Sequence, residues 1–264
     1  MAWDWKLTVM SALMYVIAFN LTFFIQELFL VLPKAFTPGL RPTLFHNNHS
    51  WDGASPLAGL FQGTGALATL LSAAVCAILL ANGVGRSAAQ RLFLFWMTYS
   101  GVFMALPQIV IGALSDQSDI GMAMAYFGLG KTSKTFAALA ALALIPLAAA
   151  TISRLLLGQL GDPALSAHAK ARQHFVFGSA TLPVLLALPL ITLFRVPREW
   201  IEVLLVPMVV SVVGVVWIQA GAWRSSGKAV GEKPIVGSLA PPLMAVLSLL
   251  LIFQLLLRPG IRFY

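Results

Sequence analysis

Glu27 is an acidic residue inside a long apolar stretch, and it follows Gln26 near the far end of that stretch. An ionisable group at membrane depth costs about 2.5–3.5 kcal/mol on insertion scales, so it usually faces a bundle interior or a wet cavity. Asn20 lies seven residues earlier, on nearly the same helical face. We therefore expect an inward-facing polar stripe of Asn20, Gln26 and Glu27. This stripe either marks a functional site or joins helices by hydrogen bonds.

Polar side chains in the next two apolar segments could complete a cleft around Glu27. Gln62 and Thr64 lie among small residues, which allow a neighbouring backbone to approach closely. Gln108 follows Pro107, and a proline inside a helix frees a backbone carbonyl that can line a cavity. We expect Gln62, Thr64 and Gln108 to line a binding cleft, although ordinary helix packing explains the same small residues.

His46 and His49 have a His-x-x-His spacing in a connection between apolar segments, and Asp52 follows them. Two imidazoles at this spacing could share one metal ion, with the carboxylate as an oxygen ligand. The alternative is a hydrogen-bonding role at the membrane surface. We expect no cofactor, and zinc remains the alternative. Cys76 is the one cysteine, which excludes an internal disulfide and a cysteine zinc cluster.

The composition defines the elements that must position these groups. The 264 residues are 59% hydrophobic and 10% charged, with a mean hydropathy of +0.88. Such a chain is a polytopic membrane protein, and we expect one all-α transmembrane helix bundle over residues 1–264. The expected spans are residues 7–32, 57–82, 92–114, 136–157, 175–194, 200–219 and 241–257. Seven helices follow, or six if the fourth or sixth segment is re-entrant.

The connections contribute further expectations. Pro33 should stop the first helix, and residues 120–129 could form a short interfacial helix. The net charge of +8 is spread over short connections, which fits membrane lipids as partners and excludes nucleic acid. Lys34 is counted among these headgroup-facing charges. Lys and Arg divide almost evenly between the two sides, so the orientation stays open. The tryptophans near segment ends are expected to anchor the bundle at the membrane surface: Trp3, Trp5, Trp51, Trp200, Trp217 and Trp223.

The first half of the chain resembles the site-2-protease-like intramembrane zinc metalloproteases. In that family an early helix carries His-Glu-x-x-His, a helix of small residues packs between, and an aspartate after a proline-containing segment supplies a further ligand. Here Gln26-Glu27-Leu28-Phe29-Leu30, Gly63-Thr64-Gly65-Ala66-Leu67-Ala68 and Ser118-Asp119-Ile120-Gly121 occupy the corresponding places. Both histidine positions are lost, so the resemblance implies a base-like Glu27, a former ligand in Asp119 and loss of hydrolysis.

The leading hypothesis is a pseudoenzyme of a bacterial inner membrane, with a metalloprotease-like core that binds a partner helix, peptide or lipid around Glu27. One alternative is an accessory subunit of a larger membrane complex. Another is an active metalloprotease with unusual ligands, in which His46 or His49 folds back toward Glu27. A fourth is a small transporter coupled to proton uptake by Glu27.

Overall fold

The computed structural model describes residues 4–161, 168–197, 200–223 and 235–264, so the expected anchor Trp3 lies outside it. Within this part of the chain, seven helices are long and apolar enough to cross a membrane. The predicted helical bundle is therefore confirmed. The segments starting near Phe136 and Trp200 are both long helices, so the count is seven and not six.

Helices and short π-helical stretches build the seven spans. Their bounds are α1 (Trp5–Ala35), α2 (Ala58–Phe61) with α3 (Thr64–Ala81), α4 (Ala88–Leu114), α6 (Lys131–Leu160), α7 (Ala169–Val176) with a π-helical turn (Phe177–Thr181) and α8 (Leu182–Arg195), a π-helical turn (Ile201–Leu205) with α9 (Val206–Gly221), and α10 (Ala240–Leu251) with a π-helical end (Ile252–Leu257). The short helix expected between the third and fourth spans is present as α5 (Asp119–Tyr126).

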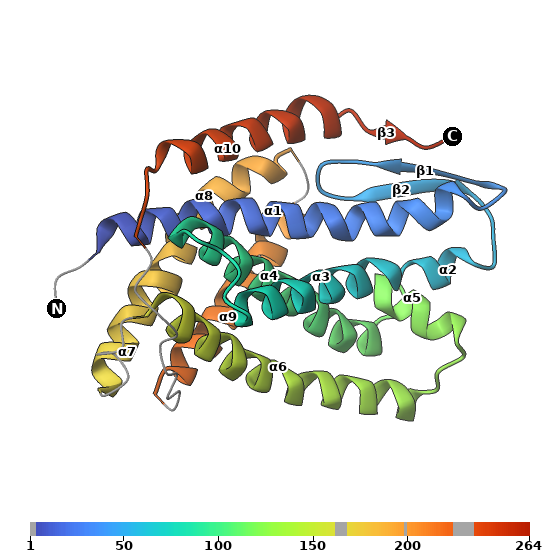
Figure 1. Ribbon diagram of the computed structural model, residues 1–264. Coiled ribbons are helices and arrows are strands. Elements are labelled where there is room, and N and C mark those ends of the chain that lie inside the picture. Colours follow the sequence, from blue (N-terminus) through green and yellow to red (C-terminus); the bar gives the residue numbers. More distant parts are fainter. Residues whose placement is uncertain (1–3, 162–167, 198–199, 224–234) are drawn as a thin grey trace.

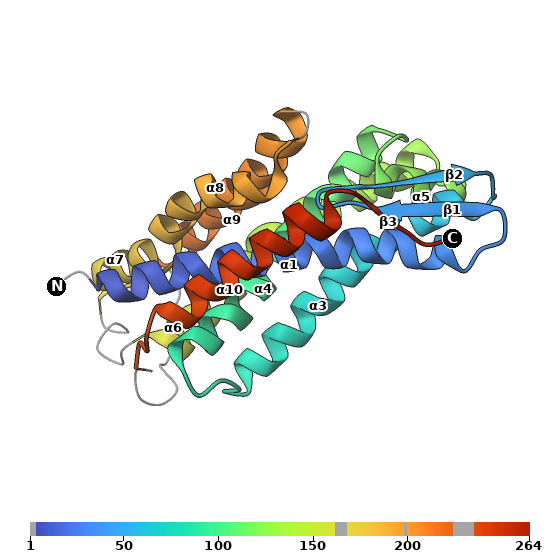
Figure 2. The same ribbon diagram turned by 90° about the horizontal axis from the view of Figure 1, so that it is seen from above.

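Helix α1 runs through the middle of the molecule, and α3, α4, α8 and α10 all pack against it. Figure 1 shows α10 along one side of α1 and α6 along the opposite side of the bundle. Figure 2 shows α3 and the α8–α9 pair leaving α1 on opposite sides. A small sheet lies at the end of α1 far from the amino terminus, which is the end that carries Glu27.

Pro33 does not stop the first helix, which continues to Ala35. A proline cannot donate to the carbonyl four residues earlier, and here that carbonyl belongs to Phe29. Thr64 supplies the missing donor, because its hydroxyl lies 2.5 Å from the Phe29 carbonyl oxygen. The helix therefore keeps one more turn, and that turn carries Lys34 into the interior, where it is fully buried.

The connection after α1 forms a β-hairpin that the sequence analysis did not predict. Strands β1 (Leu40–Leu44) and β2 (His49–Gly53) are antiparallel, and β3 (Ile261–Arg262) adds to β1, so the order is β2-β1-β3. Burial alternates along β1, as it does in a strand with one covered face. Asn47 fixes the turn by donating its side-chain amide to the Arg195 carbonyl at 2.8 Å.

A cluster of neutral polar and aromatic side chains lies in the middle of the bundle, and we call it the neutral core. It consists of Ser11, Tyr15, Trp96, Tyr99 and Ser211, and all five are fully buried. The hydroxyls of Tyr15 and Ser211 are 2.6 Å apart, and Tyr99 donates to the Ser211 carbonyl at 2.7 Å. Trp96 donates its indole N–H to Ser11 at 3.0 Å. These bonds join α1, α4 and α9.

Candidate functional site: a buried polar centre at the end of α1

Glu27 is buried on α1, with only 5% of its surface exposed, and it does not face the lipid. Its Oε2 lies 2.8 Å from Nδ1 of His49, the first residue of β2. The interior direction predicted for the carboxylate therefore agrees with the structure, and its main partner comes from the hairpin.

His49 links Glu27 to a second helix. Its Nε2 lies 3.1 Å from Oε1 of Gln62. Gln62 occupies the break between α2 and α3, so its side chain leaves the backbone where the second span changes direction. The small residues around this break allow close packing: a Cβ added to Gly65 would lie 2.7 Å from Cγ of Leu30 and 2.9 Å from the Gln26 carbonyl oxygen.

Lys34 brings a positive charge into the same site. Its Nζ donates to the Leu30 carbonyl at 2.7 Å and to Oε1 of Gln62 at 3.1 Å, and it lies 3.5 Å from Nε2 of His49. The Trp51 ring covers the ammonium, with 4.6 Å between Nζ and the ring centroid. Trp51 also stacks on the His49 ring at 5.7 Å. Lys34 and Trp51 are therefore parts of the site, which corrects their expected roles at the membrane surface.

These contacts allow two proton arrangements. When Nδ1 of His49 donates to Glu27, an unprotonated Nε2 can accept a hydrogen bond from the Lys34 ammonium. A protonated Nε2 instead donates to the carbonyl oxygen of Gln62. Nε2 of His49 therefore has a matching partner whether it accepts or donates a hydrogen bond.

Asp119 approaches this group as the first residue of α5. Burial and the Glu27 carboxylate raise the pKa of Asp119 to about 6, while His49 and Lys34 act in the opposite direction. The close fit of α5 against α4 places it there, because a Cβ added to Gly112 would lie 2.6 Å from the Ile120 side chain. We call Glu27, Lys34, His49, Gln62 and Asp119 the polar centre.

The other predicted cleft residues do not all join the polar centre. Gln108 donates to Gln26 at 2.8 Å and ties α4 to α1 beside it. The single hydroxyl proton of Thr64 lies between the Phe29 and Phe61 carbonyls, which share it. Asn20 donates to the Val16 carbonyl of its own helix at 2.8 Å and so makes its bond within α1. The predicted stripe on α1 therefore contributes Glu27 to the polar centre and Gln26 to its border.

The predicted metal ligands His46, His49 and Asp52 do not form a ligand set. The described residues contain no group of three His, Cys, Asp or Glu side chains placed to hold a metal ion. His46 is buried in the hairpin turn, and Asp52 is exposed three residues along β2 from His49. Residues three apart on a strand point to opposite faces, so Asp52 turns away from the His49 side chain.

The outer edge of β2 carries unpaired backbone groups next to the polar centre. Phe263 donates to the Pro42 carbonyl at 3.1 Å, so Pro42 faces β3. Pro42 pairs with Trp51, and Thr43 pairs with Ser50. Because antiparallel pairs alternate, Ser50 and Asp52 bond to β1, while the N–H and C=O groups of His49, Trp51 and Gly53 point outward. In the described part of the chain, none of these outward groups bonds to another backbone.

Comparisons with protein-family models, with curated proteins and with solved structures give no match to this chain.

Proposed function

We propose that this integral membrane protein binds an extended peptide segment along the outer edge of β2, where the Glu27–His49 pair contacts it. The carrying observation is that His49 belongs both to this edge and to the polar centre, through its 2.8 Å contact with Glu27. The protein would act in a bacterial inner membrane, as a binding protein with a degenerate protease-like core.

An extended peptide fits this edge better than a helix or a lipid does. A strand added to an exposed edge gains main-chain hydrogen bonds, and the outward groups of His49, Trp51 and Gly53 offer them at strand spacing. A helix has already used its backbone donors and acceptors, and a lipid tail has none. The polar centre adds the carboxylate of Glu27 and the imidazole of His49, which are groups that can bond to peptide amides or carbonyls.

The donor chemistry favours binding over hydrolysis. Gln26 and Leu30 stand where the resembled proteases have zinc-binding histidines, and leucine offers no ligand atom. Oε2 of Glu27 is held by His49, and the Lys34 ammonium lies 3.5 Å from the other imidazole nitrogen. A divalent cation would have to displace that positive charge.

One observation favours the second candidate, a metal-dependent hydrolase with unusual ligands. His49 does fold back to Glu27, and Asp119 is close enough for the Glu27 carboxylate to raise its pKa. This candidate requires Lys34 to move away from His49 Nε2. It predicts near-stoichiometric zinc in purified protein, and elemental analysis at background level would exclude a zinc hydrolase.

Photo-crosslinking tests peptide binding at β2. A benzophenone amino acid is placed at exposed Ser50 next to the free edge, or at exposed Arg41 on β1 as the matched control. We expect peptide adducts from position 50 in native membranes and few from position 41, since a bound strand would be one strand further away. Glu27→Gln should reduce the position 50 adducts about ten- to hundredfold, which corresponds to the loss of one hydrogen bond to a charged group, worth about 1.5–3 kcal/mol. Equal labelling at both positions, or labelling of lipid alone, contradicts the proposal.

A further inference from the structure

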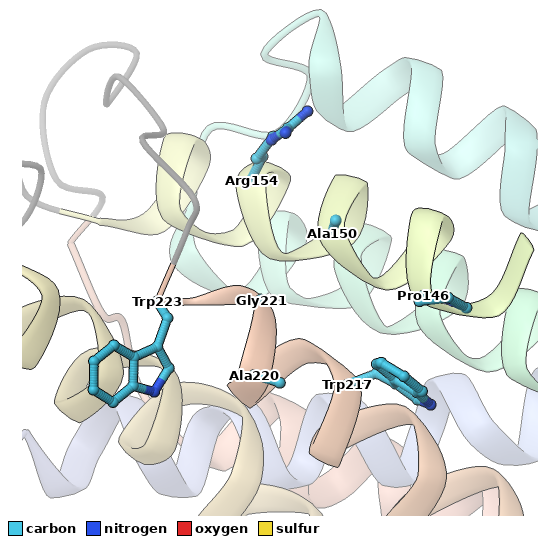
Figure 3. Close-up of a pocket in the computed structure, with 7 residues that line it drawn as sticks. All are labelled: Pro146, Ala150, Arg154, Trp217, Ala220, Gly221 and Trp223. Atoms are coloured by element: carbon cyan, nitrogen blue, oxygen red, sulfur yellow. The ribbon is translucent and has the colours of Figure 1, made fainter. Parts of the chain in front are cut away.

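A pocket of about 640 Å³ lies between α6 and α9, away from the polar centre. Its walls include Pro146, Ala150 and Arg154 of α6, with Trp217 and Gly221 of α9 and the adjoining Trp223. Figure 3 shows Trp217 near Pro146 at one end and Trp223 at the end nearer Arg154. In this view the Arg154 side chain points away from Trp217 and Trp223.

The pocket has a polar end and an apolar end. Helix α6 is the fourth span and α9 belongs to the sixth. Both therefore run in the same direction, and their carboxyl ends reach the same side of the bundle. Arg154 is near that end of α6, and Pro146 lies eight residues earlier, about 12 Å deeper at the helical rise of 1.5 Å per residue. The walls between them are apolar or formed by small residues. A molecule that fills the pocket therefore meets a cation near the membrane surface and hydrocarbon below it.

Small residues bring α6 and α9 into close contact beside the pocket. A Cβ added to Gly221 would lie 3.3 Å from Cβ of Ser153 and 3.7 Å from Cα of Ala150. The helices thus touch along these small residues, and the pocket opens beside that contact.

Arg154 is available to bind an anion. Its side chain is exposed, and in the described part of the chain it makes no ion pair. By comparison, two other arginines already bind backbone carbonyls at helix ends: Arg91 donates to the Gln159 carbonyl and Arg172 to the Ala222 carbonyl. A guanidinium group binds phosphate oxygens in a two-pronged geometry, which favours a phosphate group as its partner.

We propose that the pocket between α6 and α9 binds one acidic phospholipid, with its phosphate on Arg154 and an acyl chain along the walls toward Pro146. Basic pockets between membrane helices bind acidic headgroups, and tryptophans such as Trp223 sit at headgroup depth. The positive rim selects an acidic lipid over a zwitterionic one.

Native mass spectrometry of the purified full-length protein tests this site. The protein is titrated with phosphatidylglycerol or phosphatidylcholine of the same chain length. We expect one phosphatidylglycerol to bind about tenfold more tightly than phosphatidylcholine. Arg154→Gln should abolish this preference. Ala150→Leu, which fills the wall, should weaken both lipids.

Lys170→Gln is the matched control, because it removes one exposed charge from the same side without altering the pocket. It should leave the preference intact. Inorganic phosphate at the lipid concentration should not displace the bound lipid, because it gains nothing from the apolar walls. Unchanged preference in Arg154→Gln, loss of preference in Lys170→Gln, or displacement by phosphate alone overturns the proposal.

Discussion

The polar centre and the neutral core both bury polar side chains against α1, yet they are built differently. In the neutral core, five fully buried residues use hydroxyl and indole groups that carry no charge, and every bond joins helices that cross the bundle. In the polar centre, Glu27, Lys34 and His49 can each carry a charge, and one of them comes from a sheet edge.

This difference separates a structural cluster from a candidate site. Hydrogen bonds between neutral groups need no proton to be gained or lost, and they are strongest where water is excluded. Charged groups are expensive to bury and tolerate it only when they are paired, so their retention next to an open strand edge points to a role beyond packing. Each of the following substitutions tests this distinction.

Trp96→Ala should produce the largest loss of stability. Removing a fully buried tryptophan costs about 3–5 kcal/mol, because neighbouring side chains fill the cavity only partly. Thermal unfolding in detergent measures the change, and Glu27→Gln serves as the comparison. If Glu27→Gln proves equally destabilising, the polar centre is a structural cluster like the neutral core.

Asp119→Asn should change how stability depends on pH. The pKa of Asp119 is about 6 in the folded protein, against 3.8 for the ordinary side chain, so the folded state holds the extra proton between these values. Stability from this group is therefore fully present below about pH 4 and is lost as the pH rises through 6. The loss amounts to about 3 kcal/mol at most, since one pKa unit corresponds to about 1.4 kcal/mol.

The asparagine variant carries no titrating group at position 119. It should therefore unfold at a higher temperature than the wild type at pH 8 and lose this advantage at pH 4. Asp116→Asn provides the control, because Asp116 is exposed and its pairing with Lys134 lies outside the polar centre. A pH profile that is the same in the wild type and Asp119→Asn would show that Asp119 is not buried against Glu27.

Asn20→Leu should have the smallest effect. Its side-chain amide bonds only to the Val16 carbonyl among the described residues, and a hydrogen bond inside a membrane protein contributes about 0.6 kcal/mol on average. Crosslinking from position 50 should stay within twofold of the wild type. A large decrease in crosslinking would extend the site along α1 as far as Asn20.

Hydrophobic stretches predicted the seven spans because their length follows directly from membrane thickness. The inward direction of Glu27 was also predictable, since a buried carboxylate needs partners. Gln62 was expected nearby because it lies among small residues. Asn20 shared the predicted face, but a side chain that reaches its own helix backbone leaves no trace in residue spacing.

His49, Lys34 and Trp51 could not be assigned in the same way. The connection that holds His49 and Trp51 was treated as a loop. Its residues 40–44 nevertheless alternate between apolar and polar side chains, which is the pattern of a strand. Lys34 seemed to lie outside the membrane because Pro33 was expected to end the helix. The donor that repairs the helix, Thr64, comes from a different span, so no local pattern contains it.

The last turn of α1, which continues past Pro33 with help from Thr64, has a consequence for biogenesis. During synthesis α1 emerges before His49 and Gln62 exist, so the nascent helix carries Glu27 and Lys34 without these later partners. The first helix and the next one should therefore leave the translocon as a pair, with the hairpin folding between them. Separating them with a long inserted linker would delay the moment when the two charges become compensated.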